Sequence, residues 1–253
     1  MSPGGPHPPR REGWLSSLQS MAVTVVIALF VVTFLVQAFQ IPSESMEKTL
    51  LIGDYLLVDK LQFGEPGGLW GRILPYAAVD RGDIIVFRYP VNPDQHFVKR
   101  VVGVPGDRVR LINKRVRVNG VFLSEKYALY NRRDYDTYRD QFPVPGLASS
   151  NVESAWWSQM RELIQSGELV VPPGHYFVLG DNRDRSLDSR YWGFVPRENI
   201  IGRPLLIYWS VATPDAQRAP APRRDGGKLL DLAHSTAQFF ANIRWGRFLQ
   251  LVS

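Results

Sequence analysis

The chain has no cysteine among its 253 residues, which excludes thiolate catalysis, cysteine-ligated zinc and disulfide bonds. Histidine is scarce as well, with four residues scattered along the sequence. None of them has the His-x-x-x-His or His-Glu spacing that is typical of zinc sites. The sequence therefore predicts no metal site, and the lack of thiols suits an oxidising compartment.

Basic residues exceed acidic ones, but the excess is concentrated at the ends of the chain. The formal net charge is +6, and the segment from Arg218 onward contributes about +4 of it. The middle of the chain is nearly neutral. A basic tail without a basic core favours contact with anionic lipid over a groove that reads nucleic acid, so no nucleic-acid partner is predicted.

A run of 19 residues without charge, Met21–Phe39, follows the N-terminal segment. As a helix it would be about 28 Å long, close to the hydrocarbon thickness of a bilayer. A cleavable signal peptide would have a shorter apolar region followed by a small-x-small site. The residues at the C-terminal end of this run contain no such site. A buried core helix is the other alternative, although the run has no polar face. The sequence predicts a transmembrane anchor over residues 21–40.

The orientation of this anchor follows from the charges beside it. Arg10 and Arg11 precede the run, whereas the first basic residue after it is Lys48. Cytoplasmic flanks carry the excess of basic residues, so residues 1–20 are predicted to be a cytoplasmic tail. The remainder of the chain would then lie outside the cytoplasm.

Beyond Ser45 the sequence alternates between apolar and polar residues and has frequent glycine and proline turn signals, which predicts β-strands. Six segments carry the pattern: 54–59, 83–89, 96–102, 109–123, 176–179 and 204–210. Asn119-Gly120 predicts a hairpin turn inside the fourth of them. The expected fold is mainly β, an antiparallel sheet of about eight strands over residues 41–212.

An inserted extension is predicted over residues 113–170. It contains a helix that begins near Ser150 and Glu153, which have capping-box spacing, and stops at Gly167. A Tyr/Arg-rich segment from Tyr127 precedes the helix. Such a mixture can stack on nucleic-acid bases, but the nearly neutral middle of the chain favours a solvated loop.

After the β domain, residues 213–228 are rich in Pro, Ala, Arg and Gly, which predicts a linker. Residues 229–253 return to helical periodicity and predict a C-terminal amphipathic helix. Either it packs on the domain or it lies in the membrane interface with Arg244, Trp245 and Arg247. We expect it to promote membrane association.

Ser45 and Lys99 are the candidate catalytic pair. Ser45 lies six residues past the apolar run, and Lys99 lies on the predicted strand 96–102. A serine hydroxyl needs a base, and a lysine serves only as the neutral amine, so its pKa must fall from about 10.4 to about 7. Phe97 and Val101 share the strand face of Lys99, so burial of that face would desolvate the amine. A surface Lys-Arg pair on an edge strand is the alternative.

Four segments, in this order behind the apolar run, resemble the motifs of the type I signal peptidases, the bacterial leader peptidase family. They are Ile41–Leu50, Gly53–Lys60, Arg81–Phe87 together with Phe97–Asp107, and Gly180–Pro196. The resemblance covers the chain from the apolar run to about Ser210. It implies that Ser45 is the nucleophile, that Lys99 is the general base, and that the Ser43 hydroxyl joins the Ser45 N–H in an oxyanion hole.

The last segment supplies the supporting residues that the resemblance implies. Ser186 matches the hydroxyl that orients the lysine amine, and Asp188 and Arg190 match a polar pair near the site. Two positions depart from the family pattern: Lys48 stands where a proline is usual, and Arg185 stands where an asparagine is common. Both are expected to affect loop rigidity or substrate preference more than activity.

The resemblance also implies a function. The expected enzyme is a serine endopeptidase without a cofactor, which removes signal peptides from preproteins after small-x-small sites. Its partners would be preprotein signal peptides and the phospholipid of the bacterial inner membrane, close to the secretion translocon. The catalytic domain would be extracytoplasmic on a single-pass anchor.

Three alternatives differ in substrate or in activity. A specialised processing peptidase for one secreted or pilus-type substrate would use the same chemistry. A membrane-anchored binding paralogue without activity would be expected to lack Ser45, Lys99 or Ser186, all of which are present. A self-cleaving repressor is disfavoured by the apolar run and by the lack of a DNA-binding helical domain.

Overall fold

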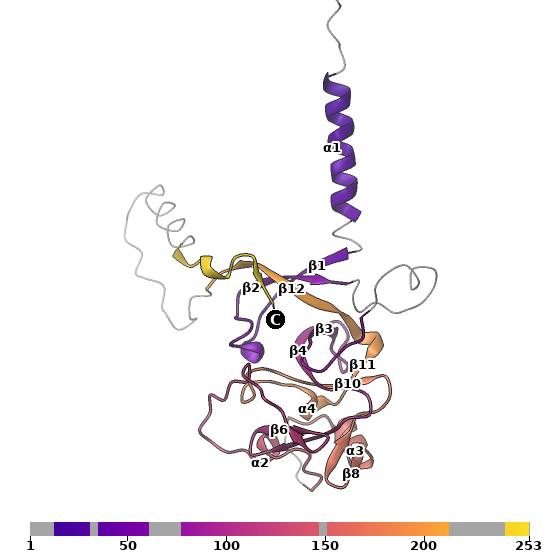
Figure 1. Cartoon of the computed structure of the whole chain (residues 1–253), viewed down its shortest axis with the longest axis vertical. Coiled ribbons are helices and arrows are strands. Elements are labelled where there is room, and N and C mark those ends of the chain that lie inside the picture. Colours follow the sequence, from indigo (N-terminus) through magenta and orange to yellow (C-terminus); the bar gives the residue numbers. More distant parts are fainter. Residues whose placement is uncertain (1–12, 31–34, 61–76, 147–150, 213–240, 253) are drawn as a thin grey trace, which may run out of the picture.

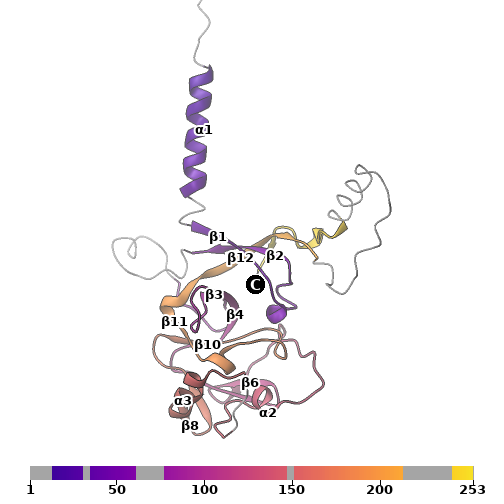
Figure 2. The same ribbon diagram turned by 180° about the vertical axis from the view of Figure 1, so that it is seen from behind.

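In the computed structural model, residues 13–30, 35–60, 77–146, 151–212 and 241–252 are described, and they form two antiparallel β-sheets (Figures 1 and 2). The larger sheet has the order β1-β2-β12-β3-β4-β10-β11, with β13 paired to β12, and the smaller has the order β7-β6-β5-β9-β8. The mainly β, antiparallel fold predicted from the sequence is confirmed.

The strands of the larger sheet are β1 (Val36–Gln40), β2 (Asp54–Asp59), β3 (Ile84–Arg88), β4 (His96–Gly103), β10 (His175–Leu179), β11 (Val195–Pro196), β12 (Ile200–Ser210) and β13 (Gln250–Leu251). Those of the smaller sheet are β5 (Arg108–Ile112), β6 (Arg115–Val118), β7 (Val121–Phe122), β8 (Ile164–Gln165) and β9 (Glu168–Val170). The α-helices are α1 (Gly13–Phe30), α2 (Thr137–Asp140), α3 (Ser154–Glu162) and α4 (Ser189–Trp192), and the 3₁₀ turns are η2 (Glu44–Met46), η4 (Arg197–Asn199) and η5 (Trp245–Arg247).

The predicted anchor over residues 21–40 is not one helix. The helix α1 begins at Gly13 and is described to Phe30, whereas Val36–Gln40 form β1, which pairs with β2 from Val36↔Asp59 to Gln40↔Tyr55. In the parts of the chain that the structure describes, no helix combines the length and the apolar character needed to cross a membrane. An uninterrupted apolar run does not distinguish helix from strand, and here pairing with β2 satisfies the backbone groups of its last residues.

The strand β3 separates the two hydrophobic cores of the larger sheet. Ile85 and Phe87 pack in one core, and Ile84 and Val86 pack in the other. Four of its five residues are fully or almost fully buried, as expected for a central strand covered on both faces. The second core also contains Met46, so the segment that follows β1 is anchored to the sheet.

The smaller sheet and α3 form the extension, at the opposite end of the domain from α1 (Figures 1 and 2). It begins at β5, Arg108, rather than at residue 113, because Val109 already pairs with Val118 and Leu169. The predicted strand 109–123 is interrupted at Asn113 and Lys114, whose φ angles of 50° and 69° make a tight turn. The predicted turn at Asn119-Gly120 is confirmed.

The helix of the extension is shorter than predicted. It begins at Ser154, after Glu153, whose side chain makes no capping hydrogen bond. Ser150 lies outside the described residues. Gly167, with φ of 77°, does not end the helix but forms the turn between β8 and β9, which pair through Gln165↔Glu168. The helical spacing of Leu163 and Ile164 misled the prediction because both residues continue the apolar face into a hairpin.

The C-terminal segment packs on the domain. Of the predicted helix over 229–253, residues 229–240 lie outside the described residues, as does the predicted linker 213–228. The remainder is not an amphipathic helix: η5 is followed by β13, and Leu251 pairs with Leu206 of β12. This segment lies beside β2 and β12 in both views (Figures 1 and 2). Long-range strand pairing has therefore overridden the local helical periodicity.

Candidate active site

The 3₁₀ turn η2 presents Ser45. Ser43 precedes it in an extended conformation, with φ of −131° and ψ of 158°. The next residue, Met46, is 1% exposed and packs in the core, which anchors the turn. On the other side, the backbone N–H of Asn182 donates to the Ser45 carbonyl over 3.1 Å. Ser45 is thus held through its backbone while its side chain is directed to the site.

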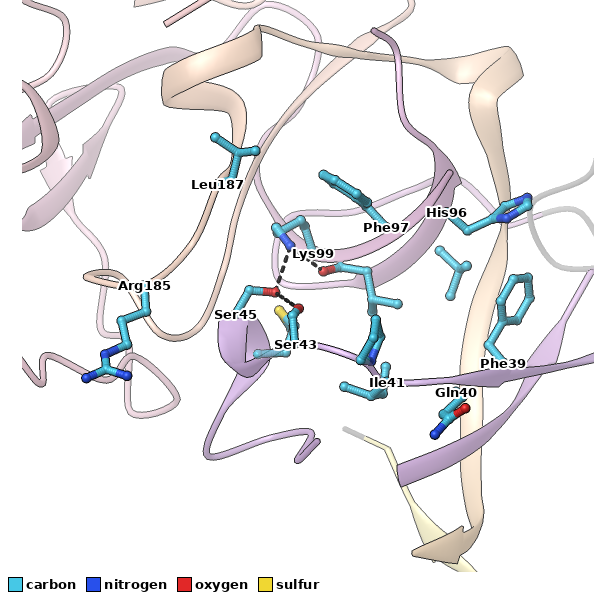
Figure 3. Close-up of a pocket in the computed structure, with 14 residues that line it drawn as sticks. Phe39, Gln40, Ile41, Ser43, Ser45, His96, Phe97, Lys99, Arg185 and Leu187 are labelled. Atoms are coloured by element: carbon cyan, nitrogen blue, oxygen red, sulfur yellow. Dashed lines mark hydrogen bonds between the residues drawn. The ribbon is translucent and has the colours of Figure 1, made fainter. Parts of the chain in front are cut away.

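Lys99 lies on β4 and reaches Ser45. Its Nζ lies 2.8 Å from Ser45 Oγ and 3.1 Å from the Val98 carbonyl oxygen. The side chain is 4% exposed, and Nζ is 5.2 Å from the centroid of the Phe97 ring (Figure 3). Burial of Lys99 decides between the two interpretations of this strand, because the surface Lys-Arg pair is excluded.

Burial lowers the pKa of Lys99 from 10.5 to about 8, against the opposing effect of the carboxylates of Asp188 and Asp181. Desolvation destabilises the ammonium form, whereas the two negative charges stabilise it. Desolvation has the larger effect. A substantial fraction of the amine is therefore neutral at mildly alkaline pH and can accept a proton.

Ser43 adds a second hydroxyl to the site. Its Oγ lies 3.3 Å from Ser45 Oγ, which thus contacts both Ser43 Oγ and Lys99 Nζ (Figure 3). Ser45 is the second residue of a 3₁₀ turn, so its N–H has no partner within the turn. The site therefore holds two hydrogen-bond donors beside the candidate nucleophile.

Ser186 is buried next to Ser45, but its side chain makes no hydrogen bond to Lys99. Its Oγ is fully buried and has no hydrogen-bond partner among the described residues. Gly180 lies between the two serines: a Cβ at this position would be 2.5 Å from both the Ser45 carbonyl oxygen and Ser186 Cβ, and would also clash with Ser186 Oγ. Only glycine permits this close approach.

Replacing Gly180 with alanine is therefore expected to destabilise the protein by about 1–3 kcal/mol or more and to impair cleavage, because Ser45 or Ser186 must move. Gly146→Ala is the matched control, since a Cβ there would meet no atom within 4 Å. Urea unfolding and cleavage assays on both variants test this expectation. Equal stability and activity of the two variants would contradict it.

Asp188 and Arg190 form a buried ion pair. Arg190 Nε and Nη2 donate to the two Asp188 carboxylate oxygens over 2.8 and 2.9 Å. Asp188 also accepts from the Gly180 N–H, while Arg190 donates to the carbonyls of Arg183 and Arg139. The pair thus braces the segment that carries Gly180 and Ser186.

A second buried ion pair was not predicted from the sequence. Arg100 Nε and Nη2 donate to Asp181 over 2.9 Å each, and Thr49 Oγ1 donates to Asp181 over 2.5 Å. Asp181 precedes Asn182, which holds the Ser45 carbonyl. The signal was present, since Arg100 adjoins Lys99 and Asp181 lies in the last motif, but only the folded chain brings the two together.

The two departures from the family pattern lie beside the site. Lys48 has φ of 86°, a conformation closed to proline, and its Nζ donates to the Lys126 carbonyl. The Arg185 guanidinium donates to both carboxylate oxygens of Glu44 over 3.0 and 2.9 Å. The pair is exposed, so its contribution to stability is small. It links the serine turn to the last motif at the mouth of the site.

A cavity of about 280 Å³ opens beside the two serines. One end is apolar, with Phe39, Ile41 and Phe97, and the other end is bordered by Arg185 and Leu187 (Figure 3). The described residues contain no group of three or more His, Cys, Asp or Glu side chains that could hold a metal ion. The lining suits small apolar groups more than charged ones.

A buried lysine amine beside a serine hydroxyl, at an apolar groove in a β domain, defines a candidate serine peptidase site. The model of the family "Signal peptidase, peptidase S26" matches residues 14–209. This chain therefore belongs to the signal peptidase family S26, whose members are serine peptidases.

Two relatives compared by sequence, from Aquifex aeolicus and Pseudomonas aeruginosa, agree with this assignment. A signal peptidase I of Aquifex aeolicus is 36% identical over 221 residues, covering 75% of this chain and 82% of the relative. A signal peptidase I of Pseudomonas aeruginosa is 36% identical over 231 residues, covering 82% and 77%. The crystal structure of a signal peptidase I of Enterococcus faecalis is 35% identical, covers 50% of this chain and 97% of that chain, and aligns with a TM-score of 0.37.

Proposed function

We propose that this protein removes signal peptides from secreted preproteins by cutting after small-x-small sites, with Ser45 as nucleophile and neutral Lys99 as general base. The observation that carries the proposal is the 2.8 Å distance between Lys99 Nζ and Ser45 Oγ within a buried site. That distance is within the range for direct proton transfer between nucleophile and base. Membership of the signal peptidase family supports the substrate class.

In the first step, Ser45 Oγ attacks the carbonyl carbon of the scissile bond while its proton moves to Lys99 Nζ. The resulting ammonium then protonates the leaving amine as the peptide C–N bond breaks, which leaves an acyl ester on Ser45. Water attacks the carbonyl carbon of the ester while Lys99 accepts one of its protons. The ester C–O bond then breaks, Lys99 passes this proton to Ser45 Oγ, and the carboxylic acid product leaves. Lys99 begins and ends the cycle as a neutral amine.

The negative oxygen of each tetrahedral intermediate requires donors fixed in advance. We assign this role to the Ser45 N–H and the Ser43 hydroxyl, which lies 3.3 Å from Ser45 Oγ. Ser186 and the Asp188–Arg190 pair would keep the residues around the Lys99 amine in position. The buried Ser186 hydroxyl, which has no hydrogen-bond partner in the part of the chain that the structure describes, would orient the amine.

The substrate would enter as an extended strand. On β4, residues 96–99 pair with β3, whereas pairing with β10 begins at Arg100, so within the described residues one edge of 96–99 is open. The edge of β1 away from β2 is likewise unpaired there. An extended peptide laid on an open edge places alternate side chains in the groove, and a cavity of about 280 Å³ suits small side chains.

We also propose that the enzyme acts at the bacterial inner membrane, with α1 in contact with lipid and the β domain on the extracytoplasmic side. Met21, Val26 and Leu29 of α1 are more than half exposed, and α1 projects from the end of the domain that carries β1 (Figure 1). Exposed apolar side chains of this kind favour a lipid surface. Flotation with liposomes should be weakened by Val26→Glu with Leu29→Glu; unchanged flotation would refute this part of the proposal.

The function is tested by incubating the purified protein in detergent with a preprotein that has an Ala-x-Ala site. The expected cut, located by mass spectrometry of both products, follows the second alanine. Ser45→Ala is the enzyme control, and a substrate with tryptophan in place of the −1 alanine is the substrate control. Cutting elsewhere, or equal cutting of the two substrates, would contradict the proposed specificity.

The same assay separates the alternatives. A folded wild-type protein that cuts none of a panel of preproteins would be the inactive binding paralogue. A protein that cuts one member of the panel would be the specialised processing peptidase. The presence of Ser45, Lys99 and Ser186 together within one buried site favours an active enzyme over the paralogue.

A further inference from the structure

The C-terminal segment places Arg247 against a buried carboxylate close to the serine turn. Asp54 at the start of β2 is completely buried, and its carboxylate accepts from Arg247 Nη2 over 2.6 Å and from Arg247 Nε over 3.2 Å. Ser210 Oγ and the Leu51 N–H also donate to it, over 2.7 and 2.8 Å, and Arg244 Nη1 forms a longer ion pair with it at 3.8 Å. A buried carboxylate requires a charged partner. The conformation of the segment between Ser45 and β2 therefore depends on an arginine that lies about 200 positions further along the chain.

Arg247 also holds the segment that runs directly from Ser45. Its Nη2 donates to the Thr49 carbonyl over 2.9 Å, four residues after the nucleophile. Arg244 adds a bond of 2.9 Å to the Ile52 carbonyl. The two arginines therefore fix residues 49–54 from outside, through backbone oxygens that strand pairing does not use.

Residues 49–54 are in turn hydrogen-bonded to two parts of the site. The Thr49 N–H donates to the Met46 carbonyl, and Thr49 Oγ1 donates to Asp181 over 2.5 Å. The Gly53 N–H donates to the Ile41 carbonyl over 3.0 Å, and Ile41 lines the groove. Displacement of residues 49–54 would thus move both the turn that carries Ser45 and the wall of the groove.

The C-terminal segment is docked by its backbone as well. The Arg244 N–H donates to the Ser210 carbonyl, the Val252 N–H donates to the Leu205 carbonyl, and Val211 bridges to Ile243. Arg247 is 17% exposed in its side chain, which is low for an arginine in a terminal segment. Since this backbone pairing does not depend on Arg247, removing its guanidinium tests the contact to Asp54 and Thr49 alone.

We propose that Arg247 is a positioning residue for catalysis: by binding Asp54 and the Thr49 carbonyl, it holds the Ser45 turn at the distance from Lys99 that proton transfer requires. This inference rests on the proposed peptidase function. Displacing a nucleophile by about 1 Å can reduce the rate about 100-fold without preventing substrate binding. Arg247 touches neither substrate nor reacting atoms, so its effect would lie in kcat rather than in KM.

The test compares Arg247→Ala, Arg247→Lys and the control Arg203→Ala in the full chain, by kcat and KM for preprotein cleavage. The control removes an arginine of β12 whose ion pair with Asp83 is longer, at 3.6 Å, and more exposed. We expect Arg247→Ala to lose about 10- to 100-fold in kcat with KM within about twofold. Arg247→Lys, which keeps the charge but not the paired donors, should recover part of the loss, and the control should match the wild type.

A kcat within twofold of the wild type for folded Arg247→Ala would overturn the inference, as would a loss expressed only in KM. Circular dichroism and the thermal midpoint show whether each variant is folded at the assay temperature. If neither Arg247 variant folds, Arg247 is needed for stability and the positioning role is refuted. A wild-type protein that does not cut at all refutes the proposed function instead, so the two failures are distinguishable.

Discussion

Replacing Lys99 with methionine is expected to reduce kcat/KM for preprotein cleavage by about 10³-fold or more, and Ser45→Ala should be at least as damaging. Among the residues that the structure describes, Lys99 Nζ is the only base within hydrogen-bond distance of Ser45 Oγ, at 2.8 Å. Loss of a general base costs about 10²–10⁴-fold, and the members of a catalytic unit fail together rather than additively. The double variant should therefore be no slower than the slower single variant.

The same pair predicts the pH dependence of the wild type. The active form of Lys99 is the neutral amine, and burial places its pKa at about 8. Below that pH the amine is protonated, so kcat/KM should fall about tenfold for each unit and level off above it. A profile with its acid limb near pH 5 instead would indicate a carboxylate base and would contradict the assignment.

A folding control is needed because Lys99 is buried. In the unfolded chain its pKa returns to about 10.5, so below pH 8 the folded protein carries a penalty of roughly 3 kcal/mol, which disappears as the pH rises from 8 to 10.5. Methionine carries no such penalty, although the two hydrogen bonds of the amine are lost. Lys99→Met should therefore be inactive yet at least as stable as the wild type at pH 7. The exposed lysine variant Lys126→Met should change neither quantity, and full activity of Lys99→Met would refute the mechanism.

The site could be predicted where the chemistry is carried by local motifs. Ser45 and Lys99 are 54 residues apart, yet they meet in the folded chain. Alternation predicted the strand that carries Lys99, whereas Ser45 was singled out by its place after the apolar run and by the motif around it. Alternation along β4 also placed Phe97 beside Lys99, as the ring contact shows. For Lys99 and Phe97, period-two patterning was sufficient.

The predicted secondary structure was wrong for segments that pair with a strand far away in the sequence. The apolar run from Met21 contains both a helix and β1, because Gln40 and its neighbours find backbone partners in β2. The tail from Leu229 has helical periodicity, but Leu251 pairs with Leu206, and Arg247 finds a buried carboxylate. A partner strand that lies far away in the chain leaves no trace in a local window, so such segments cannot be assigned from periodicity alone.

Replacing Asp188 with asparagine is expected to have two effects of different kinds. Asp188 is completely buried and binds Arg190 through both oxygens, at 2.8 and 2.9 Å. Asparagine keeps the shape but leaves the Arg190 guanidinium as an uncompensated buried charge. Breaking a buried pair in this way costs about 3–5 kcal/mol, so the free energy of unfolding at pH 7 should fall by that amount, as urea denaturation would measure.

The second effect distinguishes a role near Lys99 from a purely structural one. Asp188 is the largest of the charges that raise the pKa of Lys99 against desolvation. Removing its negative charge should lower that pKa, so the acid limb of kcat/KM in the folded variant should move to lower pH than in the wild type. Asp184→Asn is the matched control, because Asp184 is a buried carboxylate paired with Lys114 and does not act on Lys99. The control should lose stability without moving the limb. A limb that stays in place, or moves to higher pH, in Asp188→Asn would show that Asp188 supports the fold without setting the protonation of the base.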